Sequence, residues 1–150
     1  MQFHRGRLID HVHLRVADLD ASRRFYAAVL GALGLGITHE GPGFFAADDL
    51  FVSADGPPTQ GLHLAFQADG TEAVARFHAA GLGAGGRDNG PPGDRDYHPG
   101  YHAAYLLDPD GTNVEAVTHG TVLRSAPSVV LTAGGGAAGA GDARDADPEP

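Results

Sequence analysis

Residues 10–34, DHVHLRVADLDASRRFYAAVLGALG, contain two successive hydrophobic patterns. At the start, Val12 and Leu14 alternate with polar residues, and this period of two is typical of a strand with one buried face. Apolar residues then recur every three to four positions, which predicts an amphipathic helix capped by Asp18 or Asp20. The stretch therefore predicts a β-α unit whose strand has one polar face.

The same pattern recurs 52 residues further along the chain. Residues 63–86, HLAFQADGTEAVARFHAAGLGAGG, align with residues 11–34 without a gap, and ten of the 24 positions are identical. Six of those identities are Ala or Gly, which are common in this chain, so the match of His11 with His63 is more informative. The chain is therefore interpreted as an internal repeat.

Short strand candidates follow each predicted helix. After the first helix they are GITHE, GFFAA and DLFVSA. The second helix is expected at about residues 71–80, with Leu82 facing the core, and is followed by GAGGR, HAAYLL and TNVEAV. The turn sequence DPDG joins the last two. Each half therefore predicts the order βαβββ, and the chain is expected to be α+β, with a helix covering one side of each small sheet.

The repeat also predicts the domain organisation. Residues 1–120 are expected to form one domain, with module one at about residues 7–57 and module two at about residues 58–120. Residues 121–150 form a C-terminal extension rich in Ala, Gly and Pro. Its last part, residues 133–150, has too few large apolar side chains to offset the entropy of ordering. We therefore expect the extension to be largely disordered.

Composition argues against several classes of function. The chain has 150 residues and a net charge of −9, and it lacks an apolar run of the roughly 20 residues that span a membrane, so neither nucleic acid nor membrane is an expected partner. The absence of Cys excludes disulfides and thiolate chemistry, and the absence of Lys excludes a Schiff base. No signal peptide is recognisable at the N-terminus, and a cytoplasmic protein is expected.

Polar side chains occupy the strand faces that the predicted helices leave uncovered. They are His11, His13 and Arg15 in the first half, and His63 and Gln67 in the second. Such residues are poor core material, because an unpaired buried polar group costs roughly 1–3 kcal/mol. The face is therefore either exposed to water or the lining of a cavity that holds a ligand or a metal.

The position of one carboxylate favours the interpretation that this face lines a cavity. Glu115 interrupts the otherwise apolar strand candidate TNVEAV. One histidine from each half and this carboxylate make a two-histidine, one-carboxylate set that leaves positions open for water or substrate. One divalent metal ion is therefore the expected cofactor, and these ligand types suit Fe, Mn, Ni, Co or Zn.

Three segments resemble the vicinal oxygen chelate superfamily, which includes glyoxalase, bleomycin resistance proteins and extradiol dioxygenases. They are IDHVHLRVADLDASRRFYAAVLGALGL, GLHLAF and YLLDPDGTNVEAV, and with the residues between them they span about residues 8–118. The resemblance implies two βαβββ modules that form a curved open barrel around a metal and substrate cleft. It selects His11, His63 and Glu115 as metal ligands. It also implies a homodimer, with the three ligands drawn from one chain or from two.

The sequence departs from glyoxalase I at one position. Glyoxalase I has a fourth protein ligand on the last strand of its first module, where this chain has DLFVSA and offers Val52 or a neighbour. The three-ligand pattern is closer to the dioxygenases and the fosfomycin-resistance enzymes, although typical extradiol dioxygenases are about twice as long.

The segment RDNGPPGDRDYHPGYH, residues 87–102, reads as a turn-rich surface loop. It nevertheless gathers more titratable groups than a plain connection needs, and loops of this kind often close over sites. His98, Tyr101 and His102 are candidates for a general acid or base beside a metal-bound substrate.

Four residues are expected to contact the substrate itself. Arg15 and Arg95 are candidates to bind an anionic group, and His13 and Gln67 are candidates for the pocket wall. The repeat pairs His13 with Ala65, so His13 lacks a counterpart in the second half.

These features predict a divalent-metal enzyme with glyoxalase-like lyase or isomerase chemistry on a small, vicinally oxygenated substrate. The same ligands would serve an Fe(II) extradiol-type dioxygenase. A metal-free binding protein for a drug or natural product, as in bleomycin resistance, is the alternative of another class. The three potential ligands and the absence of Trp argue against that alternative.

Overall fold

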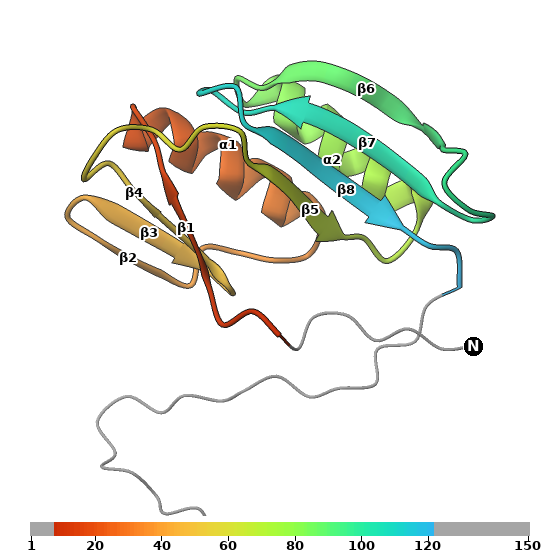
Figure 1. The fold of residues 1–150 in the computed structure, drawn as a ribbon, viewed down its shortest axis with the longest axis horizontal. Coiled ribbons are helices and arrows are strands. Elements are labelled where there is room, and N and C mark those ends of the chain that lie inside the picture. Colours follow the sequence, from red (N-terminus) through yellow and green to blue (C-terminus); the bar gives the residue numbers. More distant parts are fainter. Residues whose placement is uncertain (1–7, 122–150) are drawn as a thin grey trace, which may run out of the picture.

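The computed structural model describes residues 8–121, which form two modules of the same βαβββ order (Figure 1). Module one comprises β1 (Val12–Arg15), α1 (Leu19–Ala32), β2 (His39–Gly41), β3 (Phe44–Ala47) and β4 (Leu50–Ser53). Module two comprises β5 (His63–Gln67), α2 (Thr71–Gly83), β6 (Arg87–Asp94), β7 (His102–Leu107) and β8 (Asn113–Thr118). The α+β fold of two such modules is confirmed. The predicted disordered tail lies, apart from its first residue, outside the described residues.

Each module forms its own four-stranded mixed sheet. The strand orders are β1-β4-β3-β2 and β5-β8-β7-β6, and in both sheets the first strand runs parallel to the last. Among residues 8–121 no strand ladder joins the two sheets. Strands β1 and β5 are therefore both edge strands in this chain.

The two helices cover one face of the sheets and leave the other face open (Figure 1). Helix α1 begins after Asp18, whose carboxylate accepts a hydrogen bond of 3.0 Å from the amide of Ala21. The helices pack on strand residues such as Leu14 and Val114, and the residues between these point to what is called here the open face. Neither helix of the described chain is long and apolar enough to cross a membrane.

Helices α1 and α2 approach each other closely at Gly81. This glycine is buried, and a Cβ atom built on it would collide with Leu106 and lie 2.9 Å from Val29. The expectation that Leu82 faces the core is wrong, because Leu82 is 43% exposed. In α2 the inward positions are Phe77 and Gly81, four residues apart, so Leu82 lies about 100° further around the helix.

Strand β6 begins later than predicted. The strand candidate GAGGR is largely the end of α2 and the turn after it, and the segment expected to be a loop provides β6. Within residues 8–121 this strand forms the edge of its sheet and pairs only with β7, with register shifts between Asp88 and Gly93. An edge position tolerates Pro91 and Pro92, because prolines lack the N–H that a central strand would need on both sides.

Two carboxylates of the β7–β8 turn tie module two to module one. The Tyr26 hydroxyl donates a hydrogen bond of 2.9 Å to Asp108, which is buried. The Ala17 amide is 3.1 Å from a carboxylate oxygen of Asp110. Burial is the main cause of a raised pKa of Asp108, and the donated hydrogen bonds, from Thr112 and Tyr26 among others, oppose it. The turn expected from DPDG therefore also joins the modules.

We expect Tyr26→Phe to lower the free energy of unfolding by about 1–3 kcal/mol at pH 7, because it removes a donor from a buried carboxyl group. The pKa of Asp108 is raised, so its own contribution to stability falls as the pH rises through that pKa. Below this pKa the carboxyl group is neutral and accepts a weaker hydrogen bond. The substitution should therefore lower the free energy of unfolding by a smaller amount there. Urea unfolding at several pH values measures both effects. Tyr97→Phe, at a residue that is 73% exposed, should change little; a pH-independent cost would contradict the expectation.

Candidate metal and substrate site

The candidate site of module two is built around Glu115 on the open face of its sheet. The strand register places Glu115 between Ala65 on β5 and Tyr105 on β7. Its neighbours Val114 and Ala116 belong to the core, so its carboxylate points to the opposite side. The side chain is nevertheless only 2% exposed, because surrounding side chains cover it.

Both carboxylate oxygens of Glu115 accept a hydrogen bond. His63 Nε2 lies 2.9 Å from Oε2, and the Tyr101 hydroxyl donates to Oε1 at 2.6 Å. Burying a carboxylate costs several kcal/mol unless it is hydrogen-bonded, and these contacts offset that cost. His63 itself is about half exposed, so the pair can be reached from solvent.

Two tyrosines near this carboxylate have raised pKa values. Burial is the main cause of the raised pKa of Tyr101, followed by its hydrogen bond to Glu115. Burial, and then the negative charge of Glu115, raises the pKa of Tyr105. Tyr101 is therefore a stable hydrogen-bond donor to Glu115 in this arrangement.

The loop that carries Tyr101 is attached to the end of β8 by a pair of histidines. His98 Nε2 lies 2.9 Å from His119 Nδ1, and the two rings stack with centroids 5.1 Å apart. The Tyr101 ring meets both imidazoles edge-on. Gly100 has φ of 85° and approaches the His119 backbone so closely that a Cβ atom would lie 3.1 Å from its carbonyl oxygen. His119 was not selected from the sequence, since only the fold brings it to this loop.

The remaining candidates of module two divide between the two faces of the sheet. Arg95 lies over the Tyr105 ring, 5.3 Å from its centroid, and donates to the carbonyl of Pro91 at 2.7 Å. Gln67 is exposed and shares the open face. His102 has the orientation of core residues in β7 and bonds Asp94 at 2.7 Å, so its placement does not bring it to Glu115.

Module one places His11 on a different sheet from His63 and Glu115. His11 lies just before β1, is largely exposed and contacts Asp10 at 2.7 Å. With His13 and Phe51 it lines a shallow cavity of about 360 Å³. The predicted metal ligand His11 therefore lies beside a cavity of module one, whereas His63 and Glu115 lie on module two.

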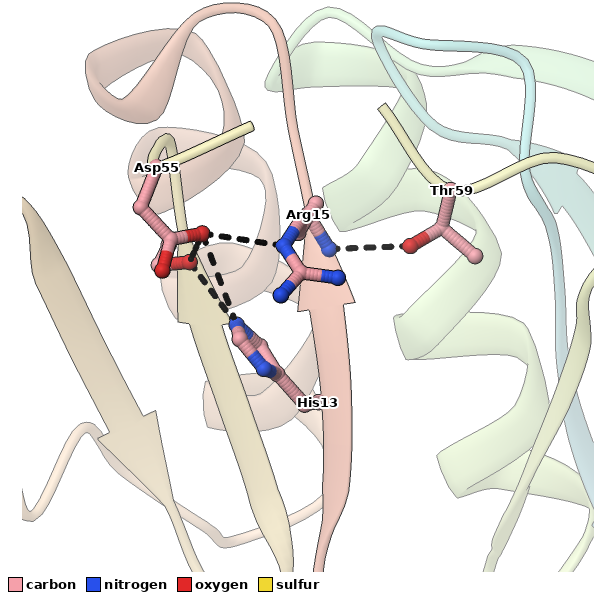
Figure 2. A network of polar contacts seen from close by, with 5 residues as sticks. His13, Arg15, Asp55 and Thr59 are labelled. Atoms are coloured by element: carbon pink, nitrogen blue, oxygen red, sulfur yellow. Dashed lines mark hydrogen bonds and ion pairs between the residues drawn. The ribbon is translucent and has the colours of Figure 1, made fainter. Parts of the chain in front are cut away.

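His13 and Arg15 belong to a polar network around Asp55 (Figure 2). The Ser53 hydroxyl donates to Asp55 at 2.6 Å and accepts from His13 Nε2 at 2.8 Å. Arg15 Nε also donates to Asp55, at 3.0 Å. The Ser53 hydrogen bond, more than Arg15, lowers the pKa of Asp55. Ser53 is buried and its proton is given to a carboxylate rather than to a histidine, so this network is not a nucleophilic triad.

The chain matches one protein-family model over most of its length. Residues 8–116 match the model of the Glyoxalase/Bleomycin resistance protein/Dioxygenase superfamily. The chain belongs to this superfamily. A glyoxalase/bleomycin resistance protein from Albidiferax ferrireducens T118 has a similar structure, with 36% sequence identity and a TM-score of 0.65 over 73% of this chain and 98% of that one.

Two further solved structures share the superfamily fold. A glyoxalase-related enzyme from Fulvimarina pelagi is 21% identical, with a TM-score of 0.59 over 81% of this chain and all of that one. A family enzyme from Burkholderia phytofirmans PsJN is 20% identical, with a TM-score of 0.59 over 73% and 97% of the two chains. None of the curated proteins compared with the chain matches it.

The chemistry of His63 and Glu115 fits the divalent metal that superfamily membership suggests. An imidazole nitrogen and a carboxylate oxygen are both ligand types that divalent metals take. His63 Nε2 and Glu115 Oε2 are 2.9 Å apart. Within residues 8–121, however, no three His, Asp or Glu side chains are grouped to hold a metal. This chain thus brings two of the three ligands expected for the superfamily together and keeps His11 apart.

The pseudo-symmetry of the superfamily fold identifies the module-one counterpart of Glu115. Glu115 pairs with Ala65, and the 52-residue repeat relates Ala65 to His13. His13 pairs with Phe51, so Phe51 holds the position that was assigned from sequence to Val52 or a neighbour. Val52 is in the core. The counterpart is a phenylalanine, and it offers no ligand atom.

Proposed function

We propose that this protein is a divalent-metal-dependent enzyme with glyoxalase-like lyase or isomerase chemistry on a small substrate that has two adjacent oxygens. The observation that supports the proposal is the pairing of His63 with Glu115 at 2.9 Å, beside solvent and on the open face of a sheet. An imidazole nitrogen and a carboxylate oxygen are ligand types that divalent metals take, and this pair offers one of each.

The residues around this pair have distinct proposed roles. His63 and Glu115 Oε2 hold the metal, and Tyr101 keeps Oε1 fixed by donating its proton to it. A divalent metal supplies Lewis acidity, which stabilises negative charge that develops on a substrate oxygen. His98 and His119 hold the Tyr101 loop against β8, and His98 remains the candidate acid or base at the rim.

The third ligand is proposed to come from a second copy of the chain. His11 lies on the other sheet, and both β1 and β5 are sheet edges in the described residues. A symmetric dimer in which module one of one chain faces module two of the other would bring His11 of one copy to His63 and Glu115 of the other. It would create two equivalent sites, each incomplete without the partner.

Substrate contacts are proposed on both walls of such a site. The two terminal nitrogens of Arg15 have no hydrogen bond in the described structure, since only its Nε binds Asp55, and they are donors for an anionic group. His13 lies beside it in Figure 2. On the other wall, Arg95 lies over the Tyr105 ring and Gln67 shares the open face with His63.

Metal analysis of the untagged protein tests the proposal. After exposure in turn to Fe(II), Mn(II), Ni(II), Co(II) and Zn(II), at least one ion should be retained at close to one per chain, and the loaded protein should convert a vicinally oxygenated substrate without consuming oxygen. Oxygen consumption would instead identify the Fe(II) dioxygenase. Failure to bind any of these ions would overturn the enzyme proposal and favour a metal-free binding protein.

A further inference from the structure

The open face of module one carries four aromatic rings in a row. His39 on β2 stacks on Phe44 on β3, with centroids 6.1 Å apart, and Phe44 stacks on Phe51 on β4 at 5.3 Å. His13 on β1 then meets the Phe51 ring edge-on at 5.0 Å. The row therefore crosses all four strands of the sheet. Phe44 and Phe51 are only partly buried, so part of each ring is available for contact.

The open faces of the two modules carry different residues at two equivalent positions. Module two has Glu115 where module one has Phe51, and it has Tyr105 where module one has Ala46, because Ala46 pairs with Phe51 as Tyr105 pairs with Glu115. One face therefore carries the carboxylate and phenols, and the other carries an aromatic surface. If the faces meet as proposed above, one wall binds oxygen atoms through the metal and the other binds an apolar, planar group.

The cavity in front of Phe51 has room for a single-ring molecule. Its volume is about 360 Å³, within the usual range of small-molecule sites, and His11, His13 and Phe51 line it together with Ala46 and Leu50.

One polar group that lines the cavity, His13, and one beyond it on the same strand, Arg15, indicate the substituents on that ring. The single proton of the Ser53 hydroxyl goes to Asp55, so His13 must donate through Nε2 and its Nδ1 is an acceptor for a hydroxyl group. Arg15 does not line the cavity, but it lies two residues beyond His13 on the same face of β1, and its two terminal nitrogens are free to bind a carboxylate. Asp48 does line the cavity, but it precedes the start of β4, whereas Arg15 pairs with the last residue of β4. A carboxylate would therefore be directed towards Arg15 and away from Asp48.

We infer that the substrate is an aromatic acid with an oxygen adjacent to its carboxylate, whose ring packs against the exposed part of Phe51. This inference rests on the proposed function and specifies the substrate class of the same site. The ring is recognised by the aromatic row, the hydroxyl by His13 and the carboxylate by Arg15.

The test compares mandelate with lactate, which have the same hydroxyl and carboxylate but differ in a phenyl or a methyl group. Binding to the metal-free, full-length protein is measured by calorimetry, so that the result does not depend on metal retention or turnover. Mandelate should bind about ten-fold more tightly than lactate, which is the effect of roughly 1.4 kcal/mol from one stacked and buried ring. Phe51→Leu should remove most of this preference, and Phe51→Tyr should keep it.

Phe66→Leu, at a partly buried phenylalanine that packs on the core, is the matched control and should leave the preference unchanged. Equal affinities, no binding of either acid, or a preference that survives Phe51→Leu would each overturn the inference. A dimer that dissociates on Phe51→Leu while the mandelate preference persists would also overturn it, by assigning the row to a subunit interface. The calorimetry uses metal-free protein, so metal binding by the unsubstituted protein tests the proposed function separately.

Discussion

Glu115→Gln is expected to weaken divalent-metal binding by about 100-fold or more while leaving the fold intact. Glutamine has the shape of glutamate and keeps an oxygen for the Tyr101 hydroxyl, which donates at 2.6 Å, but it loses the negative charge that would face the metal. Because loss of a partner that only orients a ligand costs 10–100-fold, loss of the ligand charge should cost at least as much. Equilibrium dialysis followed by elemental analysis measures the change.

Four further variants sharpen this prediction. His11→Ala and His63→Ala should weaken binding about as strongly as Glu115→Gln, whereas His13→Ala should largely retain the metal, since His13 Nε2 is bonded to Ser53. Tyr101→Phe should cost about ten-fold, as a residue that holds a ligand in place. Equal losses for His13→Ala and His11→Ala would contradict the ligand assignment.

Mixed dimers decide whether one chain or two supply the ligands. If His11 acts on the partner's His63 and Glu115, a dimer of one His11→Ala chain and one Glu115→Gln chain contains one intact site. Such a dimer, purified through two different tags, should bind about one metal ion per two chains, although neither parent binds tightly. No recovery of binding would show that all ligands belong to one chain.

Gly81→Ala is expected to destabilise the protein by about 1–3 kcal/mol, the opposite of the usual effect of Gly→Ala in a helix. Alanine normally stabilises a helix interior by about 0.5–1 kcal/mol relative to glycine. At Gly81, however, the added methyl group collides with Leu106 and lies 2.9 Å from Val29 of the facing helix. Both neighbours are fully buried, so the core must move to admit it.

Gly31→Ala in α1 is the matched control. No atom lies within 4 Å of the position that its Cβ would take, so the substitution should stabilise the protein by the usual amount. Urea unfolding of the two variants should therefore give changes of opposite sign. Stabilisation by both would mean that the helices do not pack at Gly81 in solution.

Local sequence patterns predicted most helices and strands of this protein correctly. They failed where contact with another helix or strand determines the structure. The cap at Asp18 and the strand around Leu14 depend on neighbours in sequence, and both are as expected. Leu82 fits an apolar stripe, but the approach of α1 gives the inward position to Gly81. The sequence of β6 is that of a loop, and pairing with β7 along a sheet edge makes it a strand.

For the candidate site too, sequence reasoning found the residues with a local signal and missed those that only the fold brings together. The repeat and the isolated carboxylate were sufficient to select Glu115 and His63, which the fold then brings to 2.9 Å of each other. His102 has the same residue type and the same neighbourhood in sequence as His98, but alternation along β7 turns it to the helix side. His119 had no local signal, because its contact with His98 spans 21 residues.

The sequence by itself determined the two βαβββ modules and the superfamily, because hydrophobic period and turn residues act over a few positions and the 52-residue repeat is written in the chain. Only the tertiary structure decided which polar residues meet. The register of β8 against β5 sets Glu115 opposite Ala65, where its carboxylate reaches His63. The register of β4 against β1 sets Phe51 opposite His13. The tertiary structure also places His11 on a different sheet from His63 and Glu115. The packing of whole modules depends on extended surfaces, which no short segment of sequence encodes.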